Sequence, residues 1–306
     1  MKISKETISR IEEFTNYVYG KIFISDEKVE IEMHDYAYDL DESLFTEEYY
    51  KTFNIILNNE KEVVGFLDKV NNLKENLDSL GFGRMEKRMI ISGFAIGLDI
   101  KPCMKKEFDY LQIEEIQKGL LDNLDVSIFA DTKYSWFQMK TIRESLKNGY
   151  YVPLLANHKF SNIQMKEIRY DLSRGLDVSC YANPEYGILE MREIREGLKS
   201  GVDVSIYAKP KYNSYQMTII RLGLEQGFDV SIYAKECYDA NQMGQILWGL
   251  EEGLDVSIYS KEEFTFMQMM MIRKGLKEGL DVSRYAKPNI SWEEMRNIKR
   301  MLLKKF

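Results

Sequence analysis

The sequence predicts a mainly α-helical protein: an α-solenoid of 26-residue two-helix repeats with a small α+β cap region at the N-terminus. Three features of the chain lead to this fold class: a fixed period, a recurring helix start and a recurring helix stop. The period is marked by an aspartate that returns every 26 residues, with Tyr151 filling one slot: Asp99, Asp125, Asp177, Asp203, Asp229, Asp255 and Asp281. A repeat of this length is typical of proteins in which one supersecondary unit stacks on the next.

The helix start is a capping motif that follows an aromatic residue in each repeat. In the repeat around Tyr212, Asn213 is a good N-cap, Gln216 stands three residues later and Met217 follows. In such a capping box the two polar side chains satisfy backbone N–H groups reciprocally, and the flanking apolar residues form a hydrophobic staple. The same box position is occupied in the other repeats by Glu86, Gln112, Gln138, Gln164, Glu190, Gln242, Gln268 and Glu294.

The helix stop is a glycine, as at Gly227, typical of the left-handed residue that follows a helix. The next phrase, Asp-Val-Ser-Ile-Tyr-Ala at 229–234, is predicted to form a second, short helix capped by its aspartate. A β-strand, as in leucine-rich repeats, is the competing interpretation; helix is favoured because each residue has a role at a helical junction. Glycines inside the long helix, such as Gly223, are predicted to let helices of neighbouring repeats approach closely.

Two regions are expected: an acidic α+β cap region at 1–81 and a helical repeat array at 82–306, with eight repeats and a terminal helix. In the cap region Ser4 begins a helix, and the patterns around 21–25 and 29–34 predict a hairpin that must pack on another element. A helix opening at Thr46 and continuing through Phe53, Ile56 and Leu57 is expected next. A further helix then follows Asn58 and Asn59 and ends at Gly81.

Composition narrows the class of protein. The chain has 306 residues, a net charge of −7 and three cysteines without metal-binding spacing. We expect a cytoplasmic protein with reduced thiols and no membrane association, because no signal peptide or membrane-length apolar run is visible. The two histidines, His34 and His158, are far apart in sequence, and no nucleophile, phosphate-binding or metal motif stands out. We therefore expect no enzyme activity, no cofactor and no metal.

A candidate partner-binding surface consists of the two positions after the N-cap of each long helix, which vary between repeats. Many are apolar or aromatic: Trp136, Phe137, Ile163, Leu189, Tyr215, Phe266 and Trp292. Such residues on a repetitive scaffold indicate a protein-binding surface, although packing between neighbouring repeats would explain them equally well. Tyr151 and His158 join this set because the segment 150–158 replaces the Asp-Val-Ser phrase, and a break in a strong pattern often marks function.

Two rows of basic residues follow the period. One row is Arg143, Arg169, Arg195, Arg221 and Arg273; the other is Lys209, Lys235, Lys261 and Lys287. The arginines are expected to form ion pairs or carbonyl contacts with the neighbouring repeat, and the lysines a solvated edge. The alternative is a surface for acidic partners or a nucleic-acid backbone, which the near-neutral charge of the array does not favour.

Acidic residues gather in 26–48, which holds ten carboxylates and one lysine. This segment is expected to be mostly a solvated loop. The alternative is mimicry of a nucleic-acid backbone, with carboxylates presented to a basic groove. The residues that would carry it are Asp26, Glu27, Glu30, Glu32, Asp35, Asp39, Asp41 and Glu42.

The phrase Ile-Arg-x-Gly-Leu-x-x-Gly-Leu-Asp-Val-Ser-x-Tyr-Ala is complete at 272–286 and recurs at 194–208 with Val202 in place of the second leucine. It resembles a short repeat of proteins from phages and conjugative elements of low-GC Gram-positive bacteria. The resemblance covers about 82–306. It implies no enzyme activity and suggests a mobile-element origin, with counter-defence, transfer or host manipulation as contexts.

Three functions remain open from the sequence. The first is a non-enzymatic repeat scaffold that binds a protein partner. The second is an inhibitor of a host defence nuclease, of anti-CRISPR or anti-restriction type, that uses the acidic segment as a nucleic-acid mimic. The third is direct nucleic-acid binding through the Lys and Arg rows.

Overall fold

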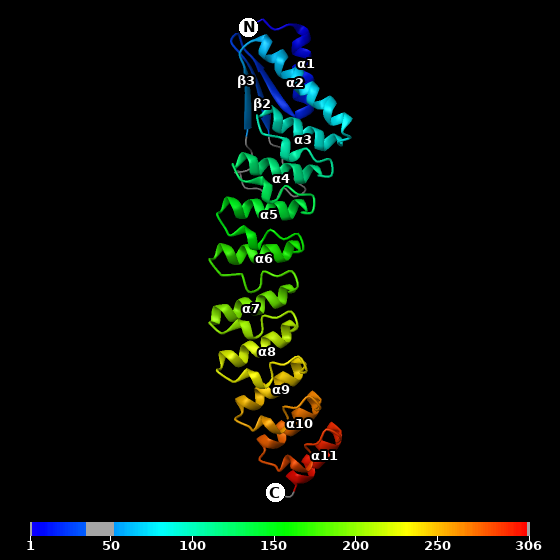
Figure 1. The fold of residues 1–306 in the computed structure, drawn as a ribbon, viewed down its shortest axis with the longest axis vertical. Helices are drawn as coiled ribbons and strands as arrows, with labels where there is room; N and C mark the ends of the chain where they lie inside the picture. The colour runs from blue at the N-terminus through cyan, green and yellow to red at the C-terminus, as the bar shows by residue number, and fades with distance from the viewer. Residues whose placement is uncertain (1, 35–51, 305–306) are drawn as a thin grey trace. The chain divides into compact units, whose positions relative to one another are not determined.

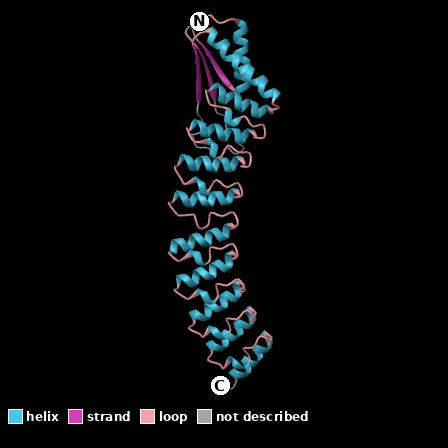
Figure 2. Cartoon of the chain, viewed as in Figure 1, coloured by secondary structure: helices cyan, strands magenta, loops and turns pink. Residues whose placement is uncertain are grey.

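The computed structural model describes residues 2–34 and 52–304 of the chain. These residues are mainly helical, with a small three-stranded antiparallel sheet near the N-terminus (Figures 1 and 2). They belong to two compact units, Met1–His158 and Lys159–Phe306. The boundary follows directly on the segment 150–158, where the repeated phrase fails. The predicted boundary at residue 81 stays a prediction.

The first unit begins with helix α1 (Lys5–Val18), which Ser4 caps by accepting a hydrogen bond from the Thr7 backbone N–H. Strands β1 (Gly20–Ile24) and β2 (Val29–His34) then form the predicted antiparallel hairpin. Helix α2 (Glu60–Ser79) follows, capped by Asn59. Apolar residues of α1, α2 and β2 make the core between helices and sheet: Ile11, Phe14, Val18, Val63, Leu67, Val29, Ile31 and Met33.

The expectation of a helix through Phe53, Ile56 and Leu57 is wrong. Residues 52–57 form strand β3 (Thr52–Leu57), which pairs antiparallel with β2. Phe53, Ile55 and Leu57 lie opposite the buried residues of β2, so alternate side chains complete the inner face of the sheet. The third strand also gives the hairpin the support it needs. Residues 46–51 lie outside the described residues.

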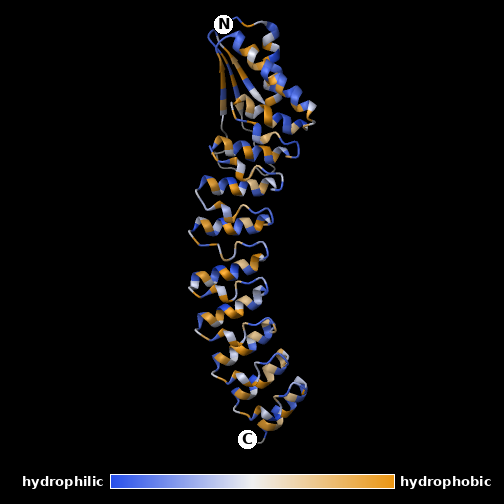
Figure 3. Cartoon of the chain, in the orientation of Figure 1, coloured by the Kyte–Doolittle hydropathy of each residue, from blue (hydrophilic) through white to orange (hydrophobic). Residues whose placement is uncertain are grey.

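In the described residues, nine long helices begin at 26-residue steps, as the period predicts. In the first unit they are α3 (Arg84–Ala95), α4 (Tyr110–Leu121) and α5 (Trp136–Lys147). In the second unit they are α6 (Asn162–Ser173), α7 (Ile188–Ser200), α8 (Ser214–Glu225), α9 (Ala240–Glu251), α10 (Phe266–Lys277) and α11 (Trp292–Leu303). Within each unit each of these helices contacts the next, and apolar and polar residues interleave along them (Figure 3).

The repeated Asp-Val-Ser phrase forms a helical turn and not a strand. It is a single 3₁₀ turn: η4 (Val126–Ile128), η6 (Val204–Ile206), η7 (Val230–Ile232), η8 (Val256–Ile258) and η9 (Val282–Arg284), with η3 (Lys101–Cys103) and η5 (Val152–Leu154) in the deviating repeats. In η7 the Asp229 carboxylate accepts the Ser231 backbone N–H at 3.0 Å, as the capping role requires. Residues 178–182 make the corresponding turn after α6.

The capping boxes are present, and their glutamine does more than close the box. In α9 the Gln242 side-chain oxygen accepts the Asp239 backbone N–H at 2.8 Å. The Gln242 side-chain NH2 donates to the Phe264 carbonyl of the next repeat, also at 2.8 Å. Gln112, Gln164, Gln216 and Gln268 make the same pair of bonds. One buried amide thus starts a helix and joins it to the following repeat.

In most repeats the glycine inside the long helix makes room for the turn after the same helix and not for a neighbouring helix, contrary to the expectation. Gly93 agrees with the expectation, because a Cβ there would lie 2.4 Å from the side-chain nitrogen of Gln117 in the next helix, α4. A Cβ built at Gly249 would lie 1.8 Å from the Tyr259 hydroxyl, in the 3₁₀ turn that follows the same helix. Gly223 meets Tyr233 in the same way. The glycine therefore leaves a notch for the fully buried tyrosine, whose hydroxyl donates to a carbonyl of the same helix, Gln245 for Tyr259. In the repeats of α7, α8 and α9 this contact closes the turn onto its own helix.

We predict that Gly249→Ala destabilises the chain by about 1–3 kcal/mol, because the new methyl group collides with the Tyr259 hydroxyl. Urea unfolding followed by circular dichroism measures the change. The control is Gly65→Ala inside α2, where nothing lies within 4 Å; it should stabilise by about 0.5–1 kcal/mol. In a Tyr259→Phe background Gly249→Ala should lower the stability by less, because the hydroxyl is gone. An equal loss of stability in both backgrounds would show that Gly249 does not serve to leave space for the Tyr259 hydroxyl.

Candidate protein-binding surface

The N-terminal end of each long helix fixes where the candidate surface residues lie. The N-cap side chain accepts the backbone N–H of the third helical residue, as Asn213 does for Gln216 at 3.0 Å. The core is filled by the residue after Gln216, Met217, which is fully buried. The second helical residue, here Tyr215, is required by neither the cap nor the core, and it points to solvent.

Three consecutive helices of the second unit carry exposed apolar residues at this second position. Ile163 of α6 is 59% exposed, Leu189 of α7 is 57% exposed and Tyr215 of α8 is 73% exposed. We call these three residues the apolar column. Because α6 contacts α7 and α7 contacts α8, and each residue has the same place on its helix, the three side chains lie in register on adjacent helices. They do not pack between the repeats.

The other candidates of this set are less exposed. In the second unit Phe266 is 37% exposed and Trp292 is half-buried. In the first unit Trp136 is 38% exposed and stacks edge-on against the half-buried Phe137, with ring centroids 5.7 Å apart. These residues are partly used in packing.

The deviating segment packs on its own repeat in the first unit. The Tyr134 hydroxyl donates to the Ala156 carbonyl at 3.0 Å, and the Tyr134 ring meets the His158 ring edge-on, with centroids 6.5 Å apart. His158 is exposed, and Tyr151 is 63% exposed. Tyr151 is thus the most exposed aromatic residue of this segment.

Two exposed aromatic residues were not among the predicted site residues. Tyr170 of α6 is 53% exposed and Trp248 of α9 is 44% exposed. Both stand seven residues after the column position of their helix, which places them on the same helix face as that position. Arg273 lies 5.5 Å from the Trp248 ring centroid. Their shared slot, directly after the arginine row, could have identified them from the sequence.

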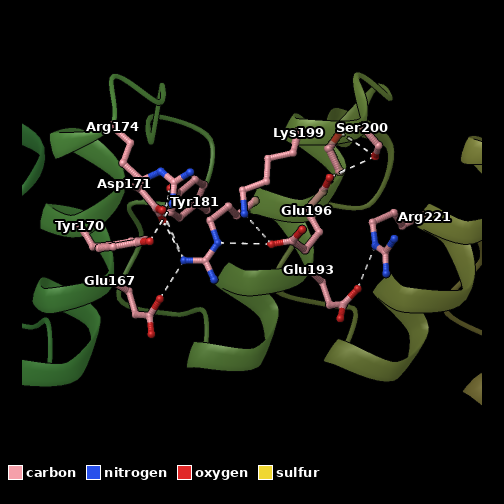
Figure 4. A network of polar contacts seen from close by, with 12 residues as sticks. Glu167, Tyr170, Asp171, Arg174, Tyr181, Glu193, Glu196, Lys199, Ser200 and Arg221 are labelled. Atoms are coloured by element: carbon pink, nitrogen blue, oxygen red, sulfur yellow. Dashed lines mark hydrogen bonds and ion pairs between the residues drawn. The ribbon is translucent and has the colours of Figure 1, made fainter.

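Four arginines of the row pair with side chains of the preceding helix. This agrees with the expectation that the arginines contact the neighbouring repeat. The partner stands 28 residues earlier: Glu115 for Arg143 at 2.8 Å, Glu167 for Arg195 at 2.8 Å, Glu193 for Arg221 at 3.0 Å and Gln245 for Arg273 at 3.1 Å. Figure 4 shows Glu193 pointing toward Arg221 on the next helix. Arg169 is half-buried and is not free either. The partners of Arg143, Arg195, Arg221 and Arg273 named above are not the repeated aspartates.

The densest of these networks lies between α6 and α7 (Figure 4). Asp171 is 1% exposed and accepts hydrogen bonds from the Tyr181 hydroxyl at 2.7 Å and from Arg195 at 3.2 Å. Burial, and the bond to Asp171, raise the pKa of Tyr181 above its ordinary value. Burial would also raise the pKa of Glu167, but the hydrogen bonds from Arg192 and Arg195 outweigh it and lower that pKa.

The lysine row is exposed throughout the second unit, at Lys209, Lys235, Lys261 and Lys287. Of the acidic candidates, Asp26 and Glu27 are exposed in the β1–β2 turn, and Glu30 pairs with Lys28 at 2.9 Å. Glu32 is half-buried. The remaining candidates lie outside the described residues: Asp35, Asp39, Asp41 and Glu42.

Within the residues that the structure describes, no group of three or more His, Cys, Asp or Glu side chains could hold a metal ion. None of the described helices combines the length and the apolar character that crossing a bilayer requires. No known protein family, curated protein or solved structure matches the chain. The inference of function therefore rests on the chain itself.

We predict that Arg143→Ala costs about 3–5 kcal/mol of stability, because it leaves the buried Glu115 carboxylate without its main partner. Arg192→Ala is the matched control: its partner is Glu167, but the Arg192 side chain is 49% exposed, so the cost should stay below about 1 kcal/mol. Chemical unfolding measures both. Equal costs would show that burial does not set the strength of these pairs.

Acid should weaken the α6–α7 network. Because the folded pKa of Glu167 lies below its ordinary value of 4.5, the ionised carboxylate stabilises the fold above that pH, and the contribution is lost as pH falls through the folded pKa. In Glu167→Gln the stability should therefore fall less steeply with acidification than in the parent chain. Thermal melts between about pH 6 and 3 measure this, and Glu263→Gln, at an exposed position, should melt like the parent.

Proposed function

We propose that this chain is a non-enzymatic repeat scaffold that binds a protein partner through the outer face of α6–α8. The observation that carries the proposal is the apolar column of Ile163, Leu189 and Tyr215, each more than half exposed on consecutive helices. Aligned apolar side chains on a regular scaffold are what a protein interface uses, because their burial on binding is favourable. We further propose that the 26-residue repeats stack as an α-solenoid.

The surroundings of the column fit a protein partner. Lys166 and Arg192 stand three residues after Ile163 and Leu189, and Glu196 lies seven residues after Leu189. Charges of both signs thus flank the apolar residues. An apolar centre with a mixed polar rim is the usual anatomy of a protein–protein interface. Tyr170 extends the apolar side of this face on α6.

Direct nucleic-acid binding gains less support, because Arg143, Arg195, Arg221 and Arg273 are held by partners of the preceding helix. The exposed lysine row alone would then have to neutralise the backbone phosphates of a bound nucleic acid. Inhibition of a defence nuclease through acidic mimicry, and a phage or mobile-element origin, stay predictions.

The triple variant Ile163→Ser, Leu189→Ser and Tyr215→Ser tests the proposal. Tagged full-length chain captures its partner from a host-cell lysate, mass spectrometry identifies the partner, and titration measures affinity. We expect a loss of at least about tenfold, because central apolar residues of an interface each contribute about 1–2 kcal/mol or more. Melting temperature should change little, since the three side chains are mostly solvent-exposed.

The matched control is Lys209→Ser, Lys235→Ser and Lys261→Ser, which also changes three exposed residues at 26-residue steps. Partner affinity should survive this change. Loss of affinity in the lysine variant, with the apolar variant unaffected, would refute the apolar column and favour binding of an acidic partner or nucleic acid.

A further inference from the structure

The free edge of the N-terminal sheet offers a second binding site. The strand order is β1-β2-β3, so β1 pairs with β2 on one side only. Among the described residues, no backbone or side-chain partner is bonded to the outer edge of β1. An exposed strand edge is a ready template for another strand, and proteins that do not use it usually cover or block it.

The hydrogen-bond pattern of the hairpin shows which groups the edge presents. The Ser25 backbone N–H donates to the Lys28 carbonyl at 2.9 Å, which makes this a bonded pair. In an antiparallel ladder bonded and non-bonded pairs alternate. Lys21 and Phe23 therefore bond to β2, while Gly20, Ile22 and Ile24 direct their N–H and C=O groups away from it. Three donors and three acceptors thus face outward at regular spacing.

A groove runs beside this edge. It is lined by Glu12, Thr15 and Asn16 of α1 and by residues 20–23 of β1, and encloses about 800 Å³ including the solvent at its mouth. A five-residue strand is about 17 Å long. A groove between a helix and an unpaired strand edge is the arrangement in which added strands bind, with backbone bonds giving affinity and side-chain contacts giving selectivity.

The side chains around the groove define the chemistry of its occupant. Phe23 is 52% exposed and Ile24 is 44% exposed, so the strand offers apolar contacts. Glu12 on the helix wall is exposed, and so is Glu27 in the turn beyond Ile24. Lys21 is the one basic residue among those that line the groove. The charge balance favours a segment with basic residues near the turn.

We propose that β1 accepts an extended segment of a partner protein as a fourth, antiparallel strand, seated between β1 and α1. The segment has apolar side chains at alternate positions and basic residues at its N-terminal end, which an antiparallel strand places beside Ile24 and the Glu27 turn. This site lies in the first unit and is independent of the apolar column. Either site can fail without the other.

The probe is a fluorescein-labelled peptide with two N-terminal lysines followed by alternating valine and threonine, added to the full-length chain. We expect saturable binding by fluorescence anisotropy. Amide hydrogen exchange should slow at Gly20, Ile22 and Ile24 and change little at Lys21 and Phe23, which are already bonded to β2. A peptide with two N-terminal glutamates should bind more weakly, because Glu12 and Glu27 repel it.

Ile24→Pro removes one outward N–H without removing a β1–β2 bond and should weaken binding roughly tenfold, the value of about one hydrogen bond. Ile24→Ala keeps the N–H and should bind within about twofold of the parent, because it loses only part of one exposed apolar contact. Circular dichroism checks that both variants fold. Equal affinity of the Pro and Ala variants would refute strand addition.

Two other results would also overturn the proposal. The first is unchanged exchange at Gly20, Ile22 and Ile24 in the presence of peptide. The second is slow exchange at these three amides without any peptide. In that case sedimentation at several concentrations tells whether a second copy of the chain occupies the edge, as a dimer, or the chain covers the edge itself, as a monomer.

Discussion

The structure depends on one buried side chain, the glutamine of the capping box. In α9 the Gln242 amide accepts the Asp239 backbone N–H of its own helix and donates to the Phe264 carbonyl of the next repeat. A buried amide with donor and acceptor both satisfied is stable only in one geometry. The same side chain therefore sets where a helix begins and how the following repeat docks on it. This explains why the long helices begin at regular 26-residue steps.

One exception keeps the link between repeats in another form. α7 has Glu190 at this position, which cannot donate through its side chain; instead its carboxylate accepts the Ser214 backbone N–H of the next helix at 2.9 Å. The link between the two repeats persists, with the direction of the hydrogen bond reversed.

The residue in the glycine slot, which leaves space for the tyrosine, also varies between repeats. In α6 Asp171 stands in place of the glycine, and its carboxylate accepts a hydrogen bond from the hydroxyl of Tyr181, ten residues later, at 2.7 Å. Where Ser145 replaces the glycine, the tyrosine slot ten residues later holds Leu155, which has no hydroxyl.

Local physics made much of the fold predictable from sequence, and nonlocal contacts account for what it missed. Capping boxes, left-handed glycines and the β1–β2 hairpin act within a few residues, so the pattern shows them directly. β3 (Thr52–Leu57) pairs with a strand that precedes a long connection, and single-segment periodicity does not report such pairing. The exposure of a side chain also depends on what packs beside it, which its position in the repeat does not show. Tyr215 and Phe137 are each the second residue after their N-cap, yet Tyr215 is 73% exposed and Phe137 is half-buried, with the Trp136 ring edge-on against it.

These constraints also determine where binding specificity can be encoded. Cap, box, core stripe, notch and ion-pair positions are each tied to a partner, so substitution there costs stability. The second helical residue and the residue seven further on, as at Leu189 and Trp248, are free to vary at little cost. Because Arg143, Arg195 and Arg221 pair with carboxylates of the preceding helix, they contribute little charge to this surface. In the proposed scaffold, apolar contact therefore supplies most of the affinity, and the choice of repeats that carry apolar residues supplies selectivity.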